Sequence, residues 1–320
     1  MRPVKPAPLF LARTGRFFAT LLAAGLAVLP AAKAEPEHPV RPLLWKIEGE
    51  GLEKTSYLFG TIHVSKGPAA TLHPAAEKAF GEATAVHTEA PFDAATQAGA
   101  VQLVIRRDGK KLSESIGKEL SKQLDDELKH INPNLDAGPF QVLKTWYVAI
   151  MLPMLPFQLE GGKPLDMNLW DRAEAGGKKT AGMQSTAEQL SGFADFNEKE
   201  QTILLGETLR LMRKDRTEGK DATKDLVDAY IAGDVEKIEA ECAKSIKATS
   251  EGEYKELGER LIKRLLTDRD VIMAGYIDNT LKKSPQDIHF FAAGAAHYTG
   301  KSGVRAHLAK KGYKITPMVP

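Results

Sequence analysis

Cysteine is almost absent from this sequence of 320 residues. The only one, Cys242, has no partner within the chain for a disulfide, and the cysteine pairs of a structural zinc site are missing for the same reason. The fold therefore has to be held by an apolar core, and a chain of this length is long enough to bury one.

The motifs of several enzyme classes are also missing. The sequence contains no His-Glu-x-x-His helix, no Gly-x-Ser-x-Gly turn and no Gly-x-x-x-x-Gly-Lys-[Ser/Thr] loop. These absences argue against zinc proteases with both histidines on one helix, against serine hydrolases built on a nucleophile turn, and against nucleotide hydrolases with a phosphate-binding loop.

Long apolar runs are missing from the interior of the sequence. The most apolar internal segment, "WYVAIMLPMLPF" at 146–157, is shorter than the ~20 residues that a membrane span needs, and Pro153 and Pro156 interrupt it. We expect a buried helix here that ends at a proline turn.

The N-terminus has the composition of a secretory signal peptide. Four basic residues lie within positions 1–16, the apolar run "FFATLLAAGLAVLPAA" follows, and "AKA" precedes Glu35. We predict that residues 1–34 are a signal peptide cleaved after Ala34, that residues 35–320 form the mature domain, and that the protein is secreted to the periplasm without a membrane span. The alternative is an uncleaved anchor.

Without residues 1–34, the sequence has nearly equal numbers of basic and acidic residues. Residues 1–34 carry five of the 44 basic residues and none of the 42 acidic ones, which leaves 39 against 42 and a formal net charge of −3. A nucleic-acid partner is therefore not expected.

Short strand-like runs alternate with longer helical patterns. Apolar runs bounded by glycine, proline or charged residues predict strands at 43–49, 56–64, 83–90, 178–184 and 287–295. Apolar residues at spacings of three and four predict helices over 74–82, 95–106, 113–130, 140–152, 165–176, 186–191, 197–214, 221–231, 234–247 and 252–282. The order predicts a helix-dominant α/β or α+β domain with a central mixed sheet.

Two strand-like runs end in the same pattern, Gly60-x-x-His63 in "YLFGTIHVS" and Gly294-x-x-His297 in "FFAAGAAHYTG". Glycine lets the backbone approach a ligand closely, and a neutral imidazole is the commonest protein ligand of transition metals. We predict that the two patterns form one site at neighbouring strand ends. The alternative is that each histidine only satisfies a loop carbonyl.

A third strand end supplies a carboxylate, Glu89 in "AVHTEA". Together with His63 and His297 it would complete the two-histidine, one-carboxylate set of hydrolytic metal sites. It would act there either as a ligand or as the proton acceptor, and the alternative is a solvated strand terminus. His87 is a weaker candidate, expected on the same side as Glu89. The other five histidines are predicted to lie at the surface: His38, His73, His130, His289 and His307.

Five segments resemble, in order and spacing, the TraB/GumN family, which includes the pheromone-shutdown proteins and the Tiki proteases. They are "YLFGTIHVS", "HTEA", "AEAGGKKTAGMQSTAEQLSGF", "DRDVIMAGYI" and "AAGAAHYTGKSGVRAHLAKKGYKI", within 43–316. The resemblance implies a metal-dependent peptidase-like fold, shared with erythromycin-esterase-like proteins. It also implies that His63, His297 and Glu89 share one site for a divalent ion, either manganese, cobalt or zinc.

The resemblance also implies a role for Arg269, which matches the first position of the family's Arg-Asn pair. Its planar guanidinium would steady a substrate carboxylate or an oxyanion, and the alternative is a surface arginine paired with Asp268 or Asp270. The chain departs from the family pattern at Gln184, where a glutamate is usual, at Asp270, where an asparagine is usual, and at Tyr298, where a leucine is usual.

Three functional hypotheses follow. The leading one is a secreted metal-dependent hydrolase that cleaves peptide bonds in a peptide or protein, with Glu89 and Arg269 as catalytic residues. The second is a non-catalytic protein that binds a peptide or a small ligand in the same cleft, which the loss of the glutamate at Gln184 favours. The third is a haem or iron carrier of related fold.

Overall fold

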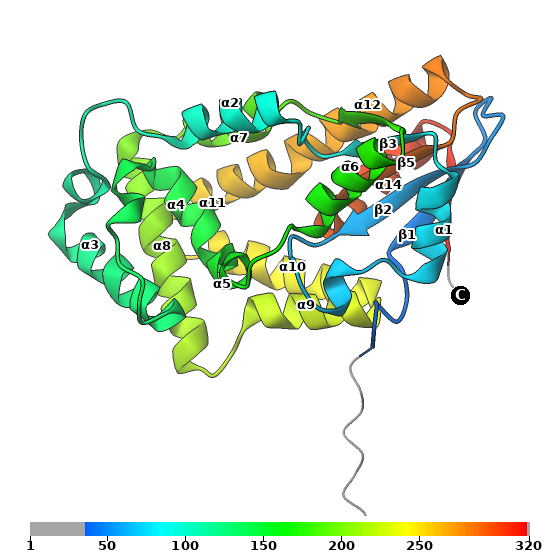
Figure 1. Ribbon diagram of the computed structural model, residues 1–320. Helices are drawn as coiled ribbons and strands as arrows, with labels where there is room; N and C mark the ends of the chain where they lie inside the picture. Colours follow the sequence, from blue (N-terminus) through cyan, green and yellow to red (C-terminus); the bar gives the residue numbers. More distant parts are fainter. Residues whose placement is uncertain (1–35, 319–320) are drawn as a thin grey trace, which may run out of the picture. The chain divides into compact units, whose positions relative to one another are not determined.

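The computed structural model describes residues 36–318, apart from the side chains at positions 191, 194 and 249 (Figure 1). The predicted signal peptide, 1–34, lies outside these residues. Within them, no helix is long and apolar enough to cross a membrane.

A six-stranded mixed sheet has the order β4-β3-β5-β2-β1-β6. Its strands are β1 (Leu44–Glu48), β2 (Ser56–Thr61), β3 (Ala85–Thr88), β4 (Lys179–Gly182), β5 (His289–Gly294) and β6 (Lys314–Pro317). Strands β4, β3, β5 and β2 are parallel, and β1 runs antiparallel to β2 and β6. The carboxyl ends of the four parallel strands therefore meet at one edge, where ligands of open sheets usually bind.

The predicted strands are confirmed with shorter ends, and β6 is the one that was not predicted. β6 is a four-residue edge strand that begins at Lys314 and ends at Pro317, so it lacks the apolar run on which the prediction relied. The predicted fold class, helix-dominant α/β with a central mixed sheet, is confirmed.

Helices cover both faces of the sheet, and this explains why the central strands are almost continuously buried. On one face, α1 (Pro74–Glu82) and α6 (Leu165–Ala175) pack through Phe80 and Leu169 against Phe59 and Phe290. On the other face, α12 (Asp268–Lys283) and α14 (Val304–Lys310) cover the strands.

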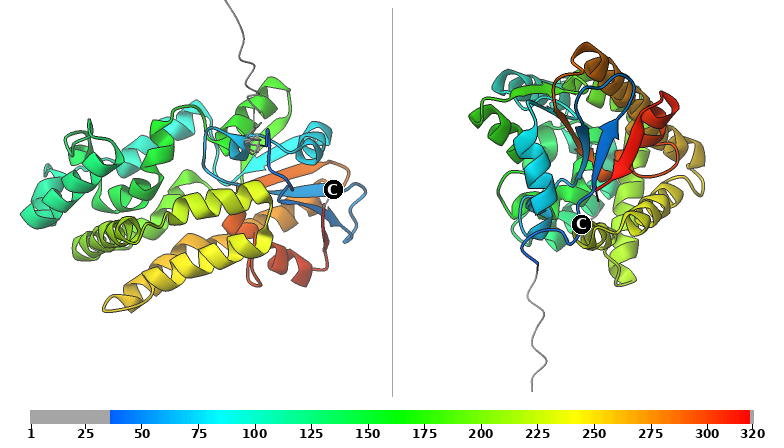
Figure 2. Two further views of the ribbon diagram at one scale, coloured as in Figure 1. Left: turned by 90° about the horizontal axis from the view of Figure 1, so that it is seen from below. Right: turned by 90° about the vertical axis from the view of Figure 1, so that its right-hand side faces the viewer.

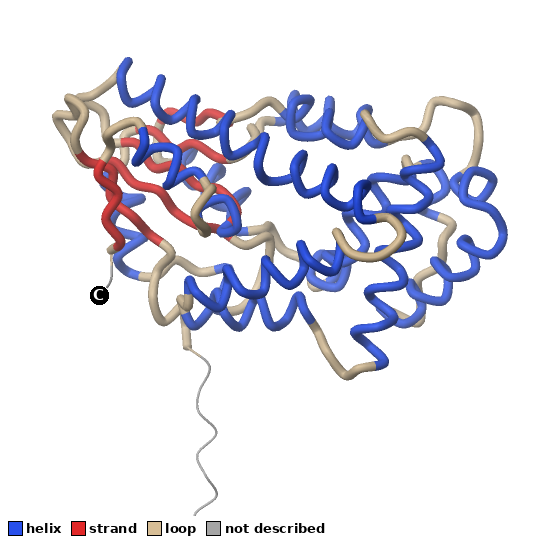
Figure 3. The backbone as a smooth tube through the Cα atoms, turned by 180° about the vertical axis from the view of Figure 1, so that it is seen from behind, coloured by secondary structure: helices blue, strands red, loops and turns tan. Residues whose placement is uncertain are grey.

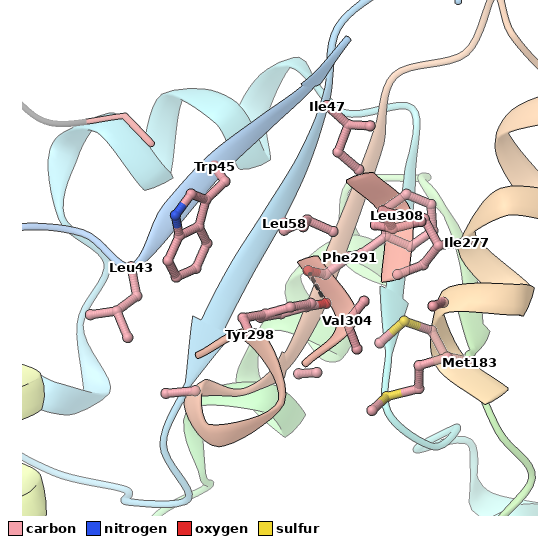
Figure 4. Packing of buried hydrophobic residues seen from close by; sticks show 14 of the residues in the cluster. Leu43, Trp45, Ile47, Leu58, Met183, Ile277, Phe291, Tyr298, Val304 and Leu308 are labelled. Carbon is pink, nitrogen blue, oxygen red and sulfur yellow. Dashed lines mark hydrogen bonds between the residues drawn. The ribbon is translucent and has the colours of Figure 1, made fainter. Parts of the chain in front are cut away.

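The core on the second face surrounds Tyr298, from the short helix α13 (Ala295–Tyr298). Figure 4 shows this ring among Trp45, Leu58 and Phe291, with a hydrogen bond of 3.0 Å from the Tyr298 hydroxyl to the Phe291 carbonyl. The tyrosine at the family's leucine position is therefore a buried core residue whose hydroxyl has a hydrogen-bond partner.

Further helices gather away from the sheet, as Figures 1 and 3 show, around a separate apolar cluster. The cluster joins α3 (Leu112–Ile131), α4 (Thr145–Met151) and α8 (Glu198–Thr217). The segment 146–157 lies here as expected: α4 is followed by a 3-10 turn at Leu152–Met154 and by α5 (Leu155–Leu159).

Two predicted helices are divided in the structure. The pattern at 140–152 splits into a 3-10 turn at Pro139–Val142 and α4, because Leu143 leaves the helix to bridge Ile105. The pattern at 252–282 splits into α11 (Lys255–Ile262), a π-helical turn at Lys263–Thr267 and α12. Such π turns often occur at functional sites, and this one directly precedes Arg269 and Asp270.

The remaining helices flank these parts. A hairpin of α9 (Ala222–Ala232) and α10 (Val235–Thr249) turns at Gly233, whose φ of 65° is left-handed. Figure 2 shows the two helices of this hairpin side by side. Near the ends of β3 and β4, α2 (Ala94–Val104) packs on α7 (Thr186–Ala194).

Candidate functional site

Three strand ends bring the two histidines and Glu89 together. β5 lies between β2 and β3, and Thr61 pairs with Gly294 in the sheet. A Cβ placed on Gly294 would lie 3.1 Å from Glu89 Oε1, 3.8 Å from His297 Cδ2 and 3.9 Å from His63 Nε2. The two Gly-x-x-His patterns therefore face one common point. The fold brings the two histidines together although 233 residues lie between them in the sequence.

The glycines of both patterns have negative or extended backbone φ, and crowding explains them. A Cβ on Gly60 would lie 3.0 Å from Leu43 Cβ and 3.3 Å from Ala295 Cα. A Cβ on Gly294 would enter the space between the carboxylate and the two rings. Each glycine is thus required by close approach, as expected, rather than by a left-handed conformation.

Each histidine ring is held from behind by an aspartate. His63 Nδ1 lies 3.0 Å from Asp166 Oδ2, and His297 Nδ1 lies 2.7 Å from Asp270 Oδ1. A carboxylate at Nδ1 favours the tautomer in which Nδ1–H donates and Nε2 presents its lone pair, the arrangement found behind metal-bound histidines. Both aspartates come from the first turns of helices, α6 and α12.

Asp166 was not predicted from the sequence. Asp270 was considered only as a departure from the family pattern and as a possible partner of Arg269. Asp166 lies 103 residues from His63, and its only local feature is a place in the first turn of a helix. The role of Asp270 is visible now: a carboxylate accepts the His297 N–H more strongly than the usual asparagine amide would.

Glu89 is buried, with 7% of its surface exposed. The alternative that it is a solvated strand terminus is therefore wrong. Its Oε1 accepts the Gly294 backbone N–H at 2.6 Å, and its Oε2 accepts from the Arg269 guanidinium and from Gln189 Nε2 at 3.3 Å. Burial raises the pKa of this carboxyl, but His297, Arg269 and His63 outweigh burial and hold the pKa well below its usual range.

Arg269 pairs with Glu89 across the site, and not with Asp268 or Asp270 as its alternative proposed. Its Nε donates to Gln184 Oε1 at 2.9 Å, and Gln184 is itself buried. The glutamine at the family's glutamate position therefore still holds the guanidinium in place, while it adds no second negative charge beside Glu89.

His63 is the more exposed of the two histidines. The charge of Asp166 raises the pKa of His63 to about 9, against the lowering effect of burial. Half of the His63 side-chain surface is exposed, so water screens the pair and weakens this shift. A protonated ring cannot ligate a metal, and ion binding at His63 would therefore release a proton.

The donor chemistry of the site fits a divalent ion in part. His297 Nε2 and Glu89 Oε2 lie 3.9 Å apart, within the ~3–4 Å that separates two ligands of one ion. Within residues 36–318, however, no three His, Cys, Asp or Glu side chains stand close enough together to hold an ion. Two aspartate-held imidazoles are in place, and Glu89 is engaged by Arg269.

Several buried polar atoms around the site lack a hydrogen-bond partner among the described residues. They are Thr61 Oγ1, Asp166 Oδ1, Gln184 Nε2 and Thr186 Oγ1. Buried polar atoms are nearly always paired, so this group indicates a place where a bound molecule, an ion or water completes the contacts.

His87 and His289 lie in the core, away from this site. His87 donates to or accepts from Tyr276 Oη at 3.1 Å and His289 Nδ1 at 3.0 Å, and its ring stacks on Phe291. His87 and Glu89 both contact side chains of α12, Tyr276 and Arg269, so the expectation that they share a side agrees with these contacts. The hydrogen-bond partners of His87 are nevertheless core residues and not residues of the site.

The surface prediction for His289 is wrong, since only 3% of it is exposed. Its partners are another histidine and the Ser284 carbonyl, so it is satisfied inside the core. Of the other four histidines, His130 is exposed and the remaining three are partly exposed.

This architecture places the chain among α/β proteins whose polar centre lies at the carboxyl ends of parallel strands. Within that class, the chain belongs to the TraB/PrgY/gumN family, whose model matches residues 43–317.

The curated relatives described here are all named metalloproteases of the TIKI type. Metalloprotease TIKI2 of Danio rerio is 24% identical over 90% of this chain and 63% of its own length. Metalloprotease TIKI1 of Homo sapiens is 23% identical over 87% and 62%, and the Metalloprotease TIKI homolog of Nematostella vectensis is 22% identical over 89% and 69%. The chain spans less than two thirds of the first relatives that it matches. No solved structure matches it significantly.

Proposed function

We propose that this protein is a metal-dependent hydrolase that cleaves peptide bonds, secreted to the periplasm after removal of residues 1–34. The observation that carries the proposal is the convergence of two aspartate-held histidines on Gly294 beside the buried Glu89. The metalloprotease names of the curated relatives support the same reaction class, at low identity.

In this proposal His63 and His297 hold a divalent ion through Nε2, and manganese, cobalt and zinc all suit this donor set. A bound ion of this kind lowers the pKa of a water molecule and polarises a substrate carbonyl. Asp166 and Asp270 fix the ring orientations and keep Nδ1 protonated.

Glu89 suits the role of a ligand better than the role of a general base. A general base works best with a pKa near the working pH, and the pKa of Glu89 is held well below its usual range by the positive charges around it. An ionised carboxylate at Oε2 would supply the third donor. Arg269 and the Gly294 N–H position it. The guanidinium would also stabilise negative charge that develops on a substrate oxygen bound beside it.

A non-catalytic peptide-binding protein is the second candidate, because Gln184 replaces a usual glutamate and three donors do not converge among residues 36–318. No feature of the site among the described residues favours the third hypothesis, a haem or iron carrier.

Metal content distinguishes the candidates. We expect the purified mature chain to retain about one manganese, cobalt or zinc ion after dialysis, and the His63→Ala, His297→Ala double variant to retain none. His130→Ala, which changes an exposed histidine, is the matched control. Elemental analysis gives the content, and cleavage of an internally quenched peptide library gives the activity.

If the protein is a hydrolase, a chelator should abolish its peptide-cleaving activity, and adding back one of the three ions should restore that activity. Equal metal content in the double variant and the wild type would rule out the proposed ligands. Bound metal and bound peptide without cleavage would favour the binding protein.

A further inference from the structure

A cavity of about 290 Å³ opens directly beside the site, with His63, Glu89 and Asp166 in its wall. This volume lies near the lower end of small-molecule sites, about 300 to 1,000 Å³. It suits one side chain and a stretch of backbone better than a large planar cofactor. The rest of the wall comes from the loop after β3 and from helices α2, α4 and α7.

The wall of this cavity away from the site is mainly apolar. Its apolar lining includes Phe92, Ala100, Val101, Val104 and Leu190 with the ring of Tyr147, and the uncharged polar residues Gln97, Thr186 and Gln189 also line it. Beyond His63, Glu89 and Asp166, no lining residue carries a charge at neutral pH. A charged side chain that reaches the apolar residues, away from His63, Glu89 and Asp166, would therefore lose its hydration without gaining a partner there.

Helix α2 supplies much of this wall, and its composition is unusual for an exposed helix. Its sequence "AATQAGAVQLV" contains no charged residue, yet Val104 is its only buried residue and Val101 is 49% exposed. Ala100, Val101 and Val104 of this helix line the cavity, and ligand pockets are lined mainly by such apolar side chains.

The polar wall carries two atoms that need a partner. Asp166 Oδ1 and Thr186 Oγ1 are buried and lack a hydrogen-bond partner among the described residues, and both residues line the cavity. A peptide backbone supplies a donor for the carboxylate and an acceptor or donor for the hydroxyl. The cavity thus combines backbone-binding atoms near the site with an apolar recess beyond them.

We propose that this cavity is a specificity pocket that binds a large apolar side chain, such as leucine or phenylalanine, on the substrate residue next to the cleaved bond. The inference rests on the proposed peptidase function. It names Val101, Ala100 and Leu190 as residues that select the substrate.

The test compares peptides Ac-Ala-X-Ala-Ala-NH2 in which X is Leu, Phe, Ser or Asp, with metal added. We expect kcat/KM for Leu and Phe to exceed that for Asp by about tenfold or more, since removal of apolar contacts from a pocket costs ~10- to 200-fold. Ala100→Trp should fill the pocket and abolish the preference. Ala98→Trp is the matched control on the same helix, because Ala98 is exposed and does not line the cavity.

The outcomes separate the inference from the proposed function. Cleavage with no preference among the four peptides, or a preference that Ala100→Trp leaves unchanged, would overturn the pocket and leave the peptidase intact. Absence of cleavage by the metal-loaded wild type would overturn the peptidase.

If no peptide is cleaved, the pocket is tested by binding. Fluorescence anisotropy then measures the affinity of the protein for fluorescein-labelled versions of the same peptides. The Phe peptide should bind about tenfold more tightly than the Asp peptide, and Ala100→Trp should remove the difference. Equal binding of the two peptides would overturn the inference.

Discussion

Gly294 shows how much one residue controls at this site. Its backbone N–H binds Glu89, and its missing side chain leaves the space in which Glu89, His63 and His297 approach one another. Its φ of −50° and ψ of 135° suit any L-residue, so a substitution here changes the site by volume and leaves the backbone unstrained.

We predict that Gly294→Ala folds but loses most of its activity. The added Cβ would stand 3.1 Å from Glu89 Oε1, so the carboxylate has to move by a few tenths of an ångström. Small displacements of reacting groups cost on the order of 10- to 100-fold in rate. The measurement is kcat/KM with thermal unfolding in parallel.

Gly275→Ala is the matched control, since a Cβ at this position of α12 meets open space. It should keep full activity and gain about 0.5–1 kcal/mol of stability from helix propensity. A Gly294→Ala protein as active as this control would contradict the view that crowding at Gly294 shapes the site.

At the scale of elements, α12 links the site to the C-terminal strand. Its first turn carries Arg269 and Asp270, and two turns later Asp278 accepts hydrogen bonds from Lys311 at 3.0 Å and from the Tyr313 hydroxyl at 2.9 Å. A third contact comes from Lys282 at 2.8 Å. The carboxylate therefore fixes α12 against the turn between α14 and β6.

The Asp278 contacts predict a loss of stability in acid. Burial raises the pKa of Asp278, but the contacts with Lys282, Lys311 and Tyr313 outweigh it and lower the pKa to about 2. A lowered pKa in the folded state adds stability above the unfolded value near ~3.9, and this contribution disappears as the pH falls from about 4 towards 2.

We expect Asp278→Asn to lower the free energy of unfolding by about 1–2 kcal/mol at pH 7. The difference from wild type should shrink as the pH falls below 4. Urea unfolding at pH 7, 5 and 3 measures it. Asp126→Asn, which breaks one exposed pair with Lys122, should cost at most ~0.5 kcal/mol. A constant difference across the three pH values would show that Asp278 acts by packing and not by charge.

At the scale of the whole described chain, apolar clusters on the two sheet faces are distinct from a third cluster among α3, α4 and α8. No disulfide is available to join them, because Cys242 is the only cysteine. The helices beyond the sheet are therefore held by packing, and Leu152, with 0% exposure, lies inside that third cluster.

We predict that Leu152→Asp destabilises the protein by about 3–5 kcal/mol, because it buries an unpaired carboxylate among apolar side chains. Leu159→Asp is the control: Leu159 ends α5 and is 45% exposed, so the change should stay within about 1 kcal/mol. Urea unfolding followed by circular dichroism compares them. Equal midpoints for Leu152→Asp and wild type would show that this cluster contributes little.

Local pattern alone was enough to predict much of the fold. Five strands and most helices follow from the spacing of apolar residues, since a strand or helix with a buried face shows its period in the sequence itself. The two Gly-x-x-His patterns and Glu89 could be placed at strand ends for the same reason, and the single cysteine excluded internal cross-links at once.

Only the tertiary structure decided which polar residues meet. Asp166 holds His63, Asp270 holds His297 and Arg269 pairs with Glu89. Each of these partners comes from a helix, α6 or α12, that is a separate element from the strand end it meets. His289 looked like a surface residue and is a core residue. The physical reason is that apolar periodicity is a local property of the chain. The burial of a polar group, in contrast, depends on whether a partner reaches it from a distant segment, and that is fixed only when the sheet order and the helix packing are complete.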